Sequence, residues 1–95
     1  ALKDLRFDFV KIDGHLVRDI CSDKVDCTMV ESINSIAHLL AIRTIAESVE
    51  ADATIEKLKS IGIDYAQGYL LGDLVPLDEI GRTDQHHSTP EFQVN

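Results

Sequence analysis

The chain has 95 residues, of which 44% are apolar and 27% charged, and its formal net charge is −8. This length predicts one small globular domain, and the acidic balance argues against duplex nucleic acid, which binds clustered Lys and Arg. There is no apolar run of the roughly 20 residues that cross a bilayer, and no signal-peptide layout at the start. We therefore expect a cytoplasmic protein, although upstream segments of a longer parent could anchor it to a membrane.

The first half of the chain predicts a strand followed by a long helix. β-forming residues near 7–13 end at a natural chain break, Asp13-Gly14. A short helical turn is expected around residues 15–20. Apolar residues at helical spacing then predict a helix near 26–40 with Asp26 as its N-cap. The apolar positions of this helix are Met29 or Val30, Ile33, Ile36 or Ala37, and Leu40.

The second half repeats the alternation. It predicts a strand near 42–47, a helix near 51–61 that ends at Gly62, and a third strand near 64–69. Strands that alternate with helices favour a parallel sheet with right-handed crossovers. A closed eight-stranded barrel takes about 250 residues, so the chain is either a small open α/β unit or a piece of something larger.

The remaining segments carry weaker signals. Pro76 would occupy the first position of a short final helix, and residues 81–95 have no periodicity, which predicts a flexible tail. Cys21 and Cys27 lack the CxxC or Cys/His spacing of a zinc site, and a disulfide scaffold is not expected.

Each predicted strand ends in a polar side chain that follows apolar or aromatic residues on the same face: Lys11, Glu47 and Gln67. Ligands of parallel α/β folds bind at the carboxyl ends of the strands, so the three side chains predict a site there. Taken singly, a strand-end lysine is usually solvated, and a buried amide is usually satisfied. Glu47 and Glu50 could equally lie in the first turn of the next helix, where carboxylates are favoured.

Three short motifs carry a resemblance to a known family. "KIDG" at 11–14, "AESVE" at 46–50 and "AQGYLLG" at 66–72 resemble, in this order, the last three strand motifs of EAL domains, the bacterial cyclic di-GMP phosphodiesterases. The resemblance covers residues 1 to about 80. It implies that the chain is the C-terminal third of the domain, the last three βα units of a modified (β/α)8 TIM-type barrel that is incomplete here.

The resemblance also implies an activity: hydrolysis of cyclic di-GMP to pGpG with Mg²⁺ or Mn²⁺. By this resemblance Lys11 lies beside the attacking water as general base or water-orienting group, and Glu47 is a metal ligand. Glu50 would support the site and its loop, and Gln67 would lie near the water and the substrate. Asp13 would lie beside the site without a catalytic step.

Two departures from the family pattern bear on these expectations. Ser48 stands where the family has glycine between the two motif glutamates, and Asp73, Leu74 and Val75 precede Pro76 where a basic residue and proline are common. The family's remaining metal ligands belong to earlier strands that these 95 residues do not include. We therefore expect an inactive segment of a larger protein, fused to further domains such as GGDEF or sensory modules, that self-associates through its exposed edges.

Two other functions remain open at this point. A degenerate EAL module would bind cyclic di-GMP or a protein partner without cleaving it. An α/β module of the response-regulator type would carry paired acids near the start of the chain, where "KID" stands instead.

Overall fold

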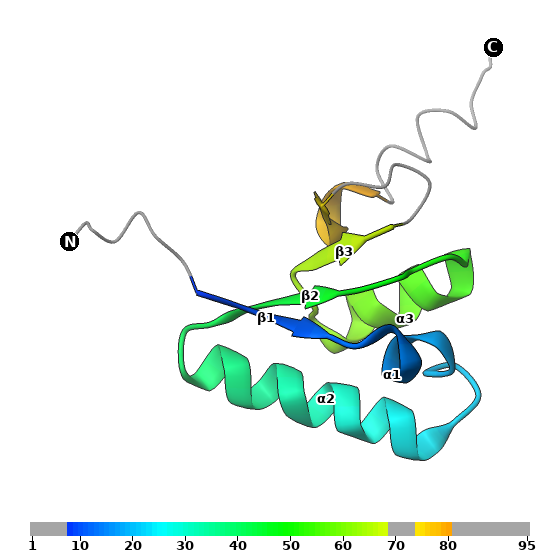
Figure 1. Cartoon of the computed structure of the whole chain (residues 1–95), viewed down its shortest axis with the longest axis horizontal. Helices are drawn as coiled ribbons and strands as arrows, with labels where there is room; N and C mark the ends of the chain where they lie inside the picture. The colour runs from blue at the N-terminus through cyan, green and yellow to red at the C-terminus, as the bar shows by residue number, and fades with distance from the viewer. Residues whose placement is uncertain (1–7, 69–73, 81–95) are drawn as a thin grey trace, which may run out of the picture.

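The computed structural model describes residues 8–68 and 74–80, which form a mixed α/β structure (Figure 1). The elements in chain order are β1 (Phe9–Ile12), α1 (Gly14–Arg18), α2 (Lys24–Leu39), β2 (Arg43–Ala46), α3 (Asp52–Ile61), β3 (Tyr65–Gln67) and β4 (Leu74–Pro76). Phe7, Tyr69 and the tail 81–95, on which some of the sequence expectations fall, lie outside the described residues.

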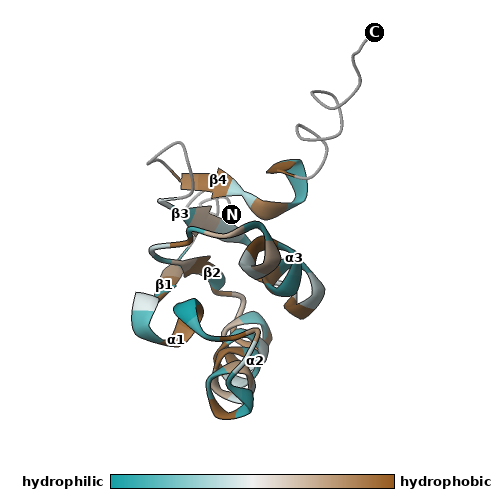
Figure 2. Ribbon diagram, turned by 90° about the vertical axis from the view of Figure 1, so that its right-hand side faces the viewer, coloured by the Kyte–Doolittle hydropathy of each residue, from teal (hydrophilic) through white to brown (hydrophobic). Residues whose placement is uncertain are grey.

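The four strands form one sheet in the order β1-β2-β3-β4. β1, β2 and β3 are parallel, as predicted, and the register aligns Lys11 with Ile45 and Ile45 with Tyr65. Because each crossover is expected to be right-handed and the strands advance in one direction, the connecting helices should lie on one side of the sheet. α2 and α3 do lie on one side of the strands (Figure 2).

β4 was not predicted from the sequence, and it corrects the prediction for Pro76. It pairs antiparallel with β3, and Pro76 is its last residue, opposite Tyr65, rather than the first residue of a helix. Residues 77–80 form the helical turn that follows. A three-residue strand is too short to show periodicity, and proline is tolerated because β4 is an edge strand of the described sheet.

The hydrophobic core lies between the sheet and the helices. Inward-facing strand residues contact the buried side chains of α2 and α3. The cluster consists of Ile12, Val17, Ile20, Val30, Ala46, Val49, Ile55, Leu58, Ile63, Ala66, Leu77 and Ile80. Strand residues in this core alternate with residues of the opposite sheet face, as a pleated strand requires.

The ends of the helices follow ordinary capping chemistry, with one correction. α2 begins at Lys24, and its N-cap is Asp23 rather than Asp26, because the Asp23 carboxylate accepts hydrogen bonds from the backbone amides of Val25 and Asp26. α3 ends at Gly62 as predicted, with a φ of 99° in the left-handed region that glycine favours.

The structure settles which apolar residues of α2 face the core. Val30 and Ala37 are buried, whereas Met29, Ile36 and Leu40 are 46%, 58% and 63% exposed. α2 therefore buries some of its apolar side chains and exposes others. Even so, among the helices of the described segments there is none with the length and apolar character that crossing a membrane requires.

Candidate functional site

The carboxyl ends of β1, β2 and β3 bring together Lys11, Glu47 and Gln67. The backbone amide of Glu47 donates to the carbonyl of Ile12 at 3.1 Å, which continues the β1–β2 ladder beyond Ala46. On the other side, the amide of Val49 donates to the carbonyl of Gln67 at 3.1 Å. The loop after β2 is thus hydrogen-bonded to both neighbouring strands at the point where the polar residues were predicted.

Lys11 and Glu47 form a loose ion pair. Their Nζ and Oε2 atoms are 3.9 Å apart, and the two side chains are 58% and 33% exposed. Lys11 aligns with Ile45, two residues before Glu47. Two residues of strand rise by about 6.6 Å, a gap that the long lysine side chain spans. A pair this exposed adds little to stability, so both charges are available to a ligand.

Three small residues let the loops approach closely enough to form this site. Ser48 has a φ of 56°, in the left-handed region that is costly for a residue with a Cβ atom. Gly14 lies against it: a Cβ atom at Gly14 would be 2.8 Å from the Ser48 Cβ atom. A Cβ atom at Gly68 would be 3.4 Å from the Ser48 Cα atom. A small residue that follows each of the three parallel strands therefore contributes to the same contact.

This contact was not predicted from the sequence, although the signal was present. Gly14, Ser48 and Gly68 are small residues at corresponding places after three successive strands. Because adjacent parallel strands bring their carboxyl ends to one edge of the sheet, equivalent small residues in the following loops predict a close approach of backbone.

Glu50 lies in a different environment from Lys11 and Glu47. Its side chain is exposed and lines a cavity of about 80 Å³ together with Val17, Arg18, Ser48, Ala51 and Thr54. This cavity joins the loop after β2 to α1 and the start of α3. Glu50 therefore lies at this cavity, and the ion pair of Lys11 and Glu47 does not include it.

A second polar cluster lies at the opposite, amino-terminal end of the strands. The Asp64 carboxylate accepts from the Thr44 amide at 2.9 Å and lies 2.7 Å from His38 Nε2. The Thr44 hydroxyl donates to Asn34 Oδ1 at 2.7 Å, and the Asn34 amide donates to the Ile61 carbonyl at 3.2 Å. These hydrogen bonds connect the C-terminal part of α2 to β2 and to Asp64, the residue that precedes β3.

This cluster gives folding stability a dependence on pH. Burial by itself raises the pKa of Asp64, but the hydrogen bonds from the Thr44 amide and His38 outweigh it and hold the pKa below its usual value. Since the folded-state pKa is lowered, the stabilisation is fully present above the unfolded-state pKa of about 3.9 and is lost as pH falls through the folded-state value.

We expect Asp64→Asn to lower the free energy of unfolding by about 2 kcal/mol at neutral pH, because it removes a charged acceptor of several hydrogen bonds. The variant should also lose less stability than the parent chain when the pH falls below about 4. Urea unfolding between pH 2.5 and 7 measures both effects. The exposed Asp19 provides the matched Asp19→Asn control; if Asp64→Asn resembled it, the assigned role of Asp64 would be wrong.

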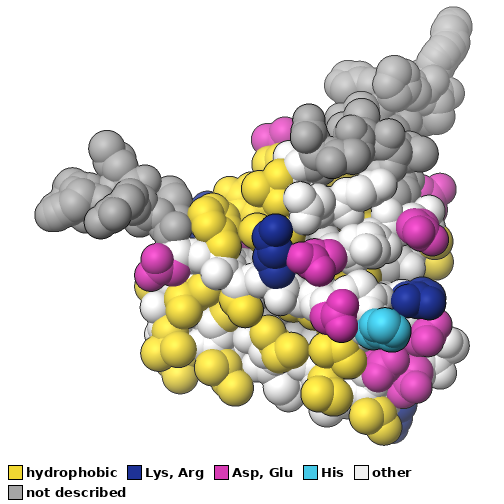
Figure 3. Space-filling model, viewed as in Figure 1, with side chains coloured by type: hydrophobic (Ala, Val, Ile, Leu, Met, Phe, Trp, Pro, Cys, Tyr) yellow, Lys and Arg dark blue, Asp and Glu magenta, His cyan; other side chains and the backbone are white. Residues whose placement is uncertain are grey.

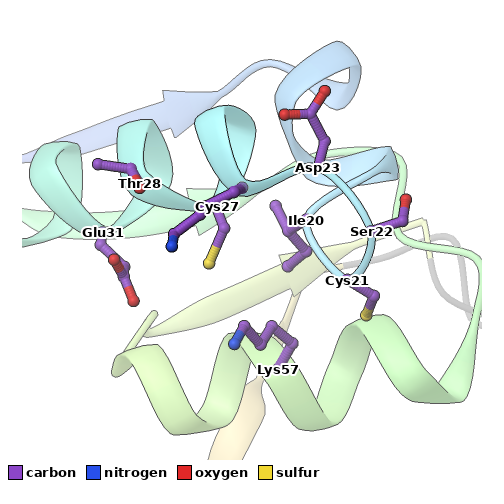
Figure 4. A pocket seen from close by; sticks show the side chains of 9 residues that line it. Ile20, Cys21, Ser22, Asp23, Cys27, Thr28, Glu31 and Lys57 are labelled. Atoms are coloured by element: carbon purple, nitrogen blue, oxygen red, sulfur yellow. The ribbon is translucent and has the colours of Figure 1, made fainter.

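The two cysteines are both free thiols in separate elements. Cys27 projects from α2 and Cys21 from the preceding turn, on the border of a hollow of about 350 Å³ between α2 and α3 (Figure 4). The Cys21 thiol donates to the Ala53 carbonyl at 3.5 Å. A thiol is a weak donor, and neither cysteine belongs to the site at the strand ends.

Glu47 offers the chemistry of a ligand for a hard divalent cation, which prefers carboxylate oxygens. It stands at a strand end, is one-third exposed and forms a long ion pair with Lys11. Within residues 8–68 and 74–80 there is no gathering of three or more His, Cys, Asp or Glu side chains that could hold a metal ion. The described residues therefore fit one position of a metal site.

Comparison with known proteins agrees with the motifs. A family model described as EAL domain matches residues 1–73. Over 76 residues the chain is 42% identical to the cyclic di-GMP phosphodiesterase PdeB of Shewanella oneidensis. The matched region makes up 80% of this chain and 9% of PdeB. The chain thus spans about a tenth of the length of this curated relative.

Two solved structures have the same arrangement. The cAMP-bound form of the EAL enzyme Bd1971 superposes with a TM-score of 0.66 at 33% identity, covering 86% of this chain and 22% of that one. The c-di-GMP-bound form of a standalone EAL protein from Vibrio cholerae O395 gives a TM-score of 0.62 at 33% identity, covering 70% and 28%.

Proposed function

Because this chain belongs to the EAL domain family, we propose that it is the C-terminal third of the catalytic domain of a cyclic di-GMP phosphodiesterase. The relatives supply the substrate: PdeB is named as a cyclic di-GMP phosphodiesterase, and the Vibrio cholerae protein was solved with cyclic di-GMP bound. The chain covers 9% of PdeB, which supports the proposal that the activity belongs to a longer protein.

The one-sided sheet supports the proposal that the chain is an arc of a modified (β/α)8 barrel. In such a barrel the helices form an outer ring and the inner sheet face is filled by side chains of the strands. Here α2 and α3 lie on one side, and the opposite face carries Phe9, Lys11 and Tyr65. Phe9 is 46% exposed and its ring contacts that of Tyr65 edge-on, with centroids 5.8 Å apart.

The observation that carries the proposed function is the Lys11–Glu47 pair at the carboxyl ends of adjacent parallel strands, 3.9 Å apart. This is the end of the strands at which β/α barrels place their catalytic residues. Lys11 supplies a cation, Glu47 a carboxylate and Gln67 an amide, which together suit a phosphodiester, a divalent metal and a water molecule.

In the proposed reaction, water attacks a phosphorus atom of cyclic di-GMP and one ester P–O bond breaks, which gives linear pGpG. A bound Mg²⁺ or Mn²⁺ would neutralise phosphate charge and lower the pKa of the attacking water. Glu47 would hold this cation through a carboxylate oxygen. Lys11 would orient the water or accept its proton, Gln67 would donate an amide hydrogen bond near the reacting atoms, and Glu50 would keep the Glu47 loop in place.

We expect the longer protein to convert cyclic di-GMP to pGpG in the presence of Mn²⁺, and the isolated 95-residue chain to show no turnover. The reason is that Glu47 provides one ligand, whereas catalytic metal sites in proteins need several. Chromatography of the nucleotides after incubation measures both reactions. Turnover by the isolated chain would contradict this division, and a longer protein that binds cyclic di-GMP without cleaving it would indicate a degenerate module instead.

A further inference from the structure

The small cavity beside Glu50 is lined by a buried polar side chain, Thr54. This residue lies in the first turn of α3, is 7% exposed and borders the cavity of about 80 Å³. Among the residues that the structure describes, none forms a hydrogen bond with its hydroxyl. Buried hydroxyls are nearly always hydrogen-bonded, so we expect the partner of Thr54 to lie in the cavity.

The start of α3 needs acceptors in the same region. Ala51 is the N-cap of this helix and makes no side-chain hydrogen bond to the first turn. The first amide groups of a helix have no acceptor within the helix itself, and a capping side chain usually supplies one. Ala51 and Thr54 both line the cavity. A molecule bound there could therefore accept hydrogen bonds from the helix start as well as from the hydroxyl.

The remaining polar residues of the cavity identify water as its occupant. Arg18 supplies a guanidinium, Glu50 a carboxylate and Ser48 a hydroxyl, and charged side chains of both signs gather beside α1 in the space-filling view (Figure 3). The described ranges contain no cluster of three His, Cys, Asp or Glu that could hold a cation, and the carboxylate repels an anion. Water both donates and accepts, and 80 Å³ exceeds the roughly 30 Å³ that one water occupies.

We propose that Thr54 is a positioning residue, because ordered water in this cavity joins its hydroxyl to the Glu50 carboxylate and so fixes the loop that carries Glu47. Water held by several polar groups in this way is part of a protein's structure and is costly to remove. The effect on Glu47 rests on the proposed function, whereas the water site itself does not.

A third attachment of the loop would complete two that the structure shows. The amide of Glu47 bonds to a carbonyl of β1, and the amide of Val49 bonds to a carbonyl of β3. Glu50 is the next residue, and its side chain lines the cavity that Thr54 borders. A water bridge there connects the loop to α3. The backbone on both sides of the Glu47 side chain is then tied to a neighbouring element.

Thr54→Val in the 95-residue chain tests the water site through the sign of its effect. Valine has nearly the shape and helix propensity of threonine but lacks the hydroxyl. If water satisfies the hydroxyl, we expect the unfolding equilibrium constant to rise about threefold or more, because a hydrogen bond is lost. A buried hydroxyl without any partner costs free energy, so a lower constant would overturn the proposal. Thr28→Val, exposed on α2, should change the constant less than about twofold.

A double-mutant cycle tests whether the water reaches Glu50. In a Glu50→Ala background the bridge is already broken, so Thr54→Val should raise the unfolding equilibrium constant at least about twofold less than it does in the parent chain. Urea unfolding of the four chains measures this difference. Equal effects of Thr54→Val in both backgrounds would show that the two side chains are not joined, which would overturn the proposal.

The Mn²⁺ affinity of the longer protein tests the positioning role. Thr54→Val should raise the dissociation constant for Mn²⁺ at least about threefold, because residues that orient a metal ligand affect metal affinity. Thr54→Ser keeps the hydroxyl and should stay closer to the parent, although it loses a buried methyl group. An unchanged Mn²⁺ affinity in Thr54→Val would overturn the positioning role. A longer protein that does not cleave cyclic di-GMP would instead contradict the proposed function, and the unfolding measurements on the 95-residue chain would still decide the water site.

Discussion

Glu47→Gln is expected to lower the rate of cyclic di-GMP hydrolysis by the longer protein at least about a hundredfold, because a neutral amide replaces a charged metal ligand. The change keeps the size of the side chain and removes only the negative charge. Isothermal titration with Mn²⁺ gives a second measurement, in which the affinity should fall together with the rate.

Glu56→Gln is the matched control for this variant. Glu56 is 73% exposed on α3 and forms a long ion pair with Lys59, 3.9 Å away. The control should retain the rate of the parent protein within about twofold, since exposed ion pairs contribute little. If Glu47→Gln lowered neither the rate nor the Mn²⁺ affinity, Glu47 would not be a metal ligand.

Gly14→Ala should lower the free energy of unfolding by about 1–3 kcal/mol, the usual cost of overpacking a buried contact. The added methyl group would lie 2.8 Å from the Ser48 Cβ atom and 2.9 Å from its Oγ atom. The Cβ atom cannot rotate away as the end of a flexible side chain could, so the loop after β2 must move. Urea unfolding of the chain measures the loss.

The double variant Gly14→Ala/Ser48→Gly separates this contact from every other effect of the alanine. Once Ser48 loses its side chain, the nearest atom left to the new methyl group is the Glu47 carbonyl oxygen, at an ordinary 3.6 Å. The double variant should therefore be at least as stable as Ser48→Gly alone, since alanine is also the better helix former by about 1 kcal/mol. If Gly14→Ala cost the same in both backgrounds, the contact with Ser48 would not be the cause.

The sequence predicted the elements whose periodicity extends over several residues. The strands expected near 42–47 and 64–69 correspond to β2 and β3, and the helix expected near 51–61 corresponds to α3. Periodicity could not predict β4, because three residues show none, nor the choice between Asp23 and Asp26 as N-cap. Both aspartates precede the same apolar stripe, and only the backbone path decides which carboxylate reaches the free amides.

For the site, strand alternation predicted that Lys11, Glu47 and Gln67 would lie at one rim of the sheet, and Lys11 and Glu47 form an ion pair there. It could not predict the Asp64 cluster, because that cluster depends on a side chain of the loop before β3 reaching His38 on α2. Nor could it predict which of Met29 and Val30 faces the core, since an apolar residue at either position satisfies a helical stripe. Which of the two residues is buried depends on how α2 packs against the sheet.

The strand order β1-β2-β3-β4 has a consequence for how the chain folds. Every strand pairs with the one that follows it along the sequence, so each new pairing closes only the loop that has just been added. The entropic cost of closing such a loop grows slowly with its length, and folding is faster when contacting residues are near in sequence. The sheet can therefore grow by one strand at a time in chain order, with each completed unit forming the edge on which the next one assembles.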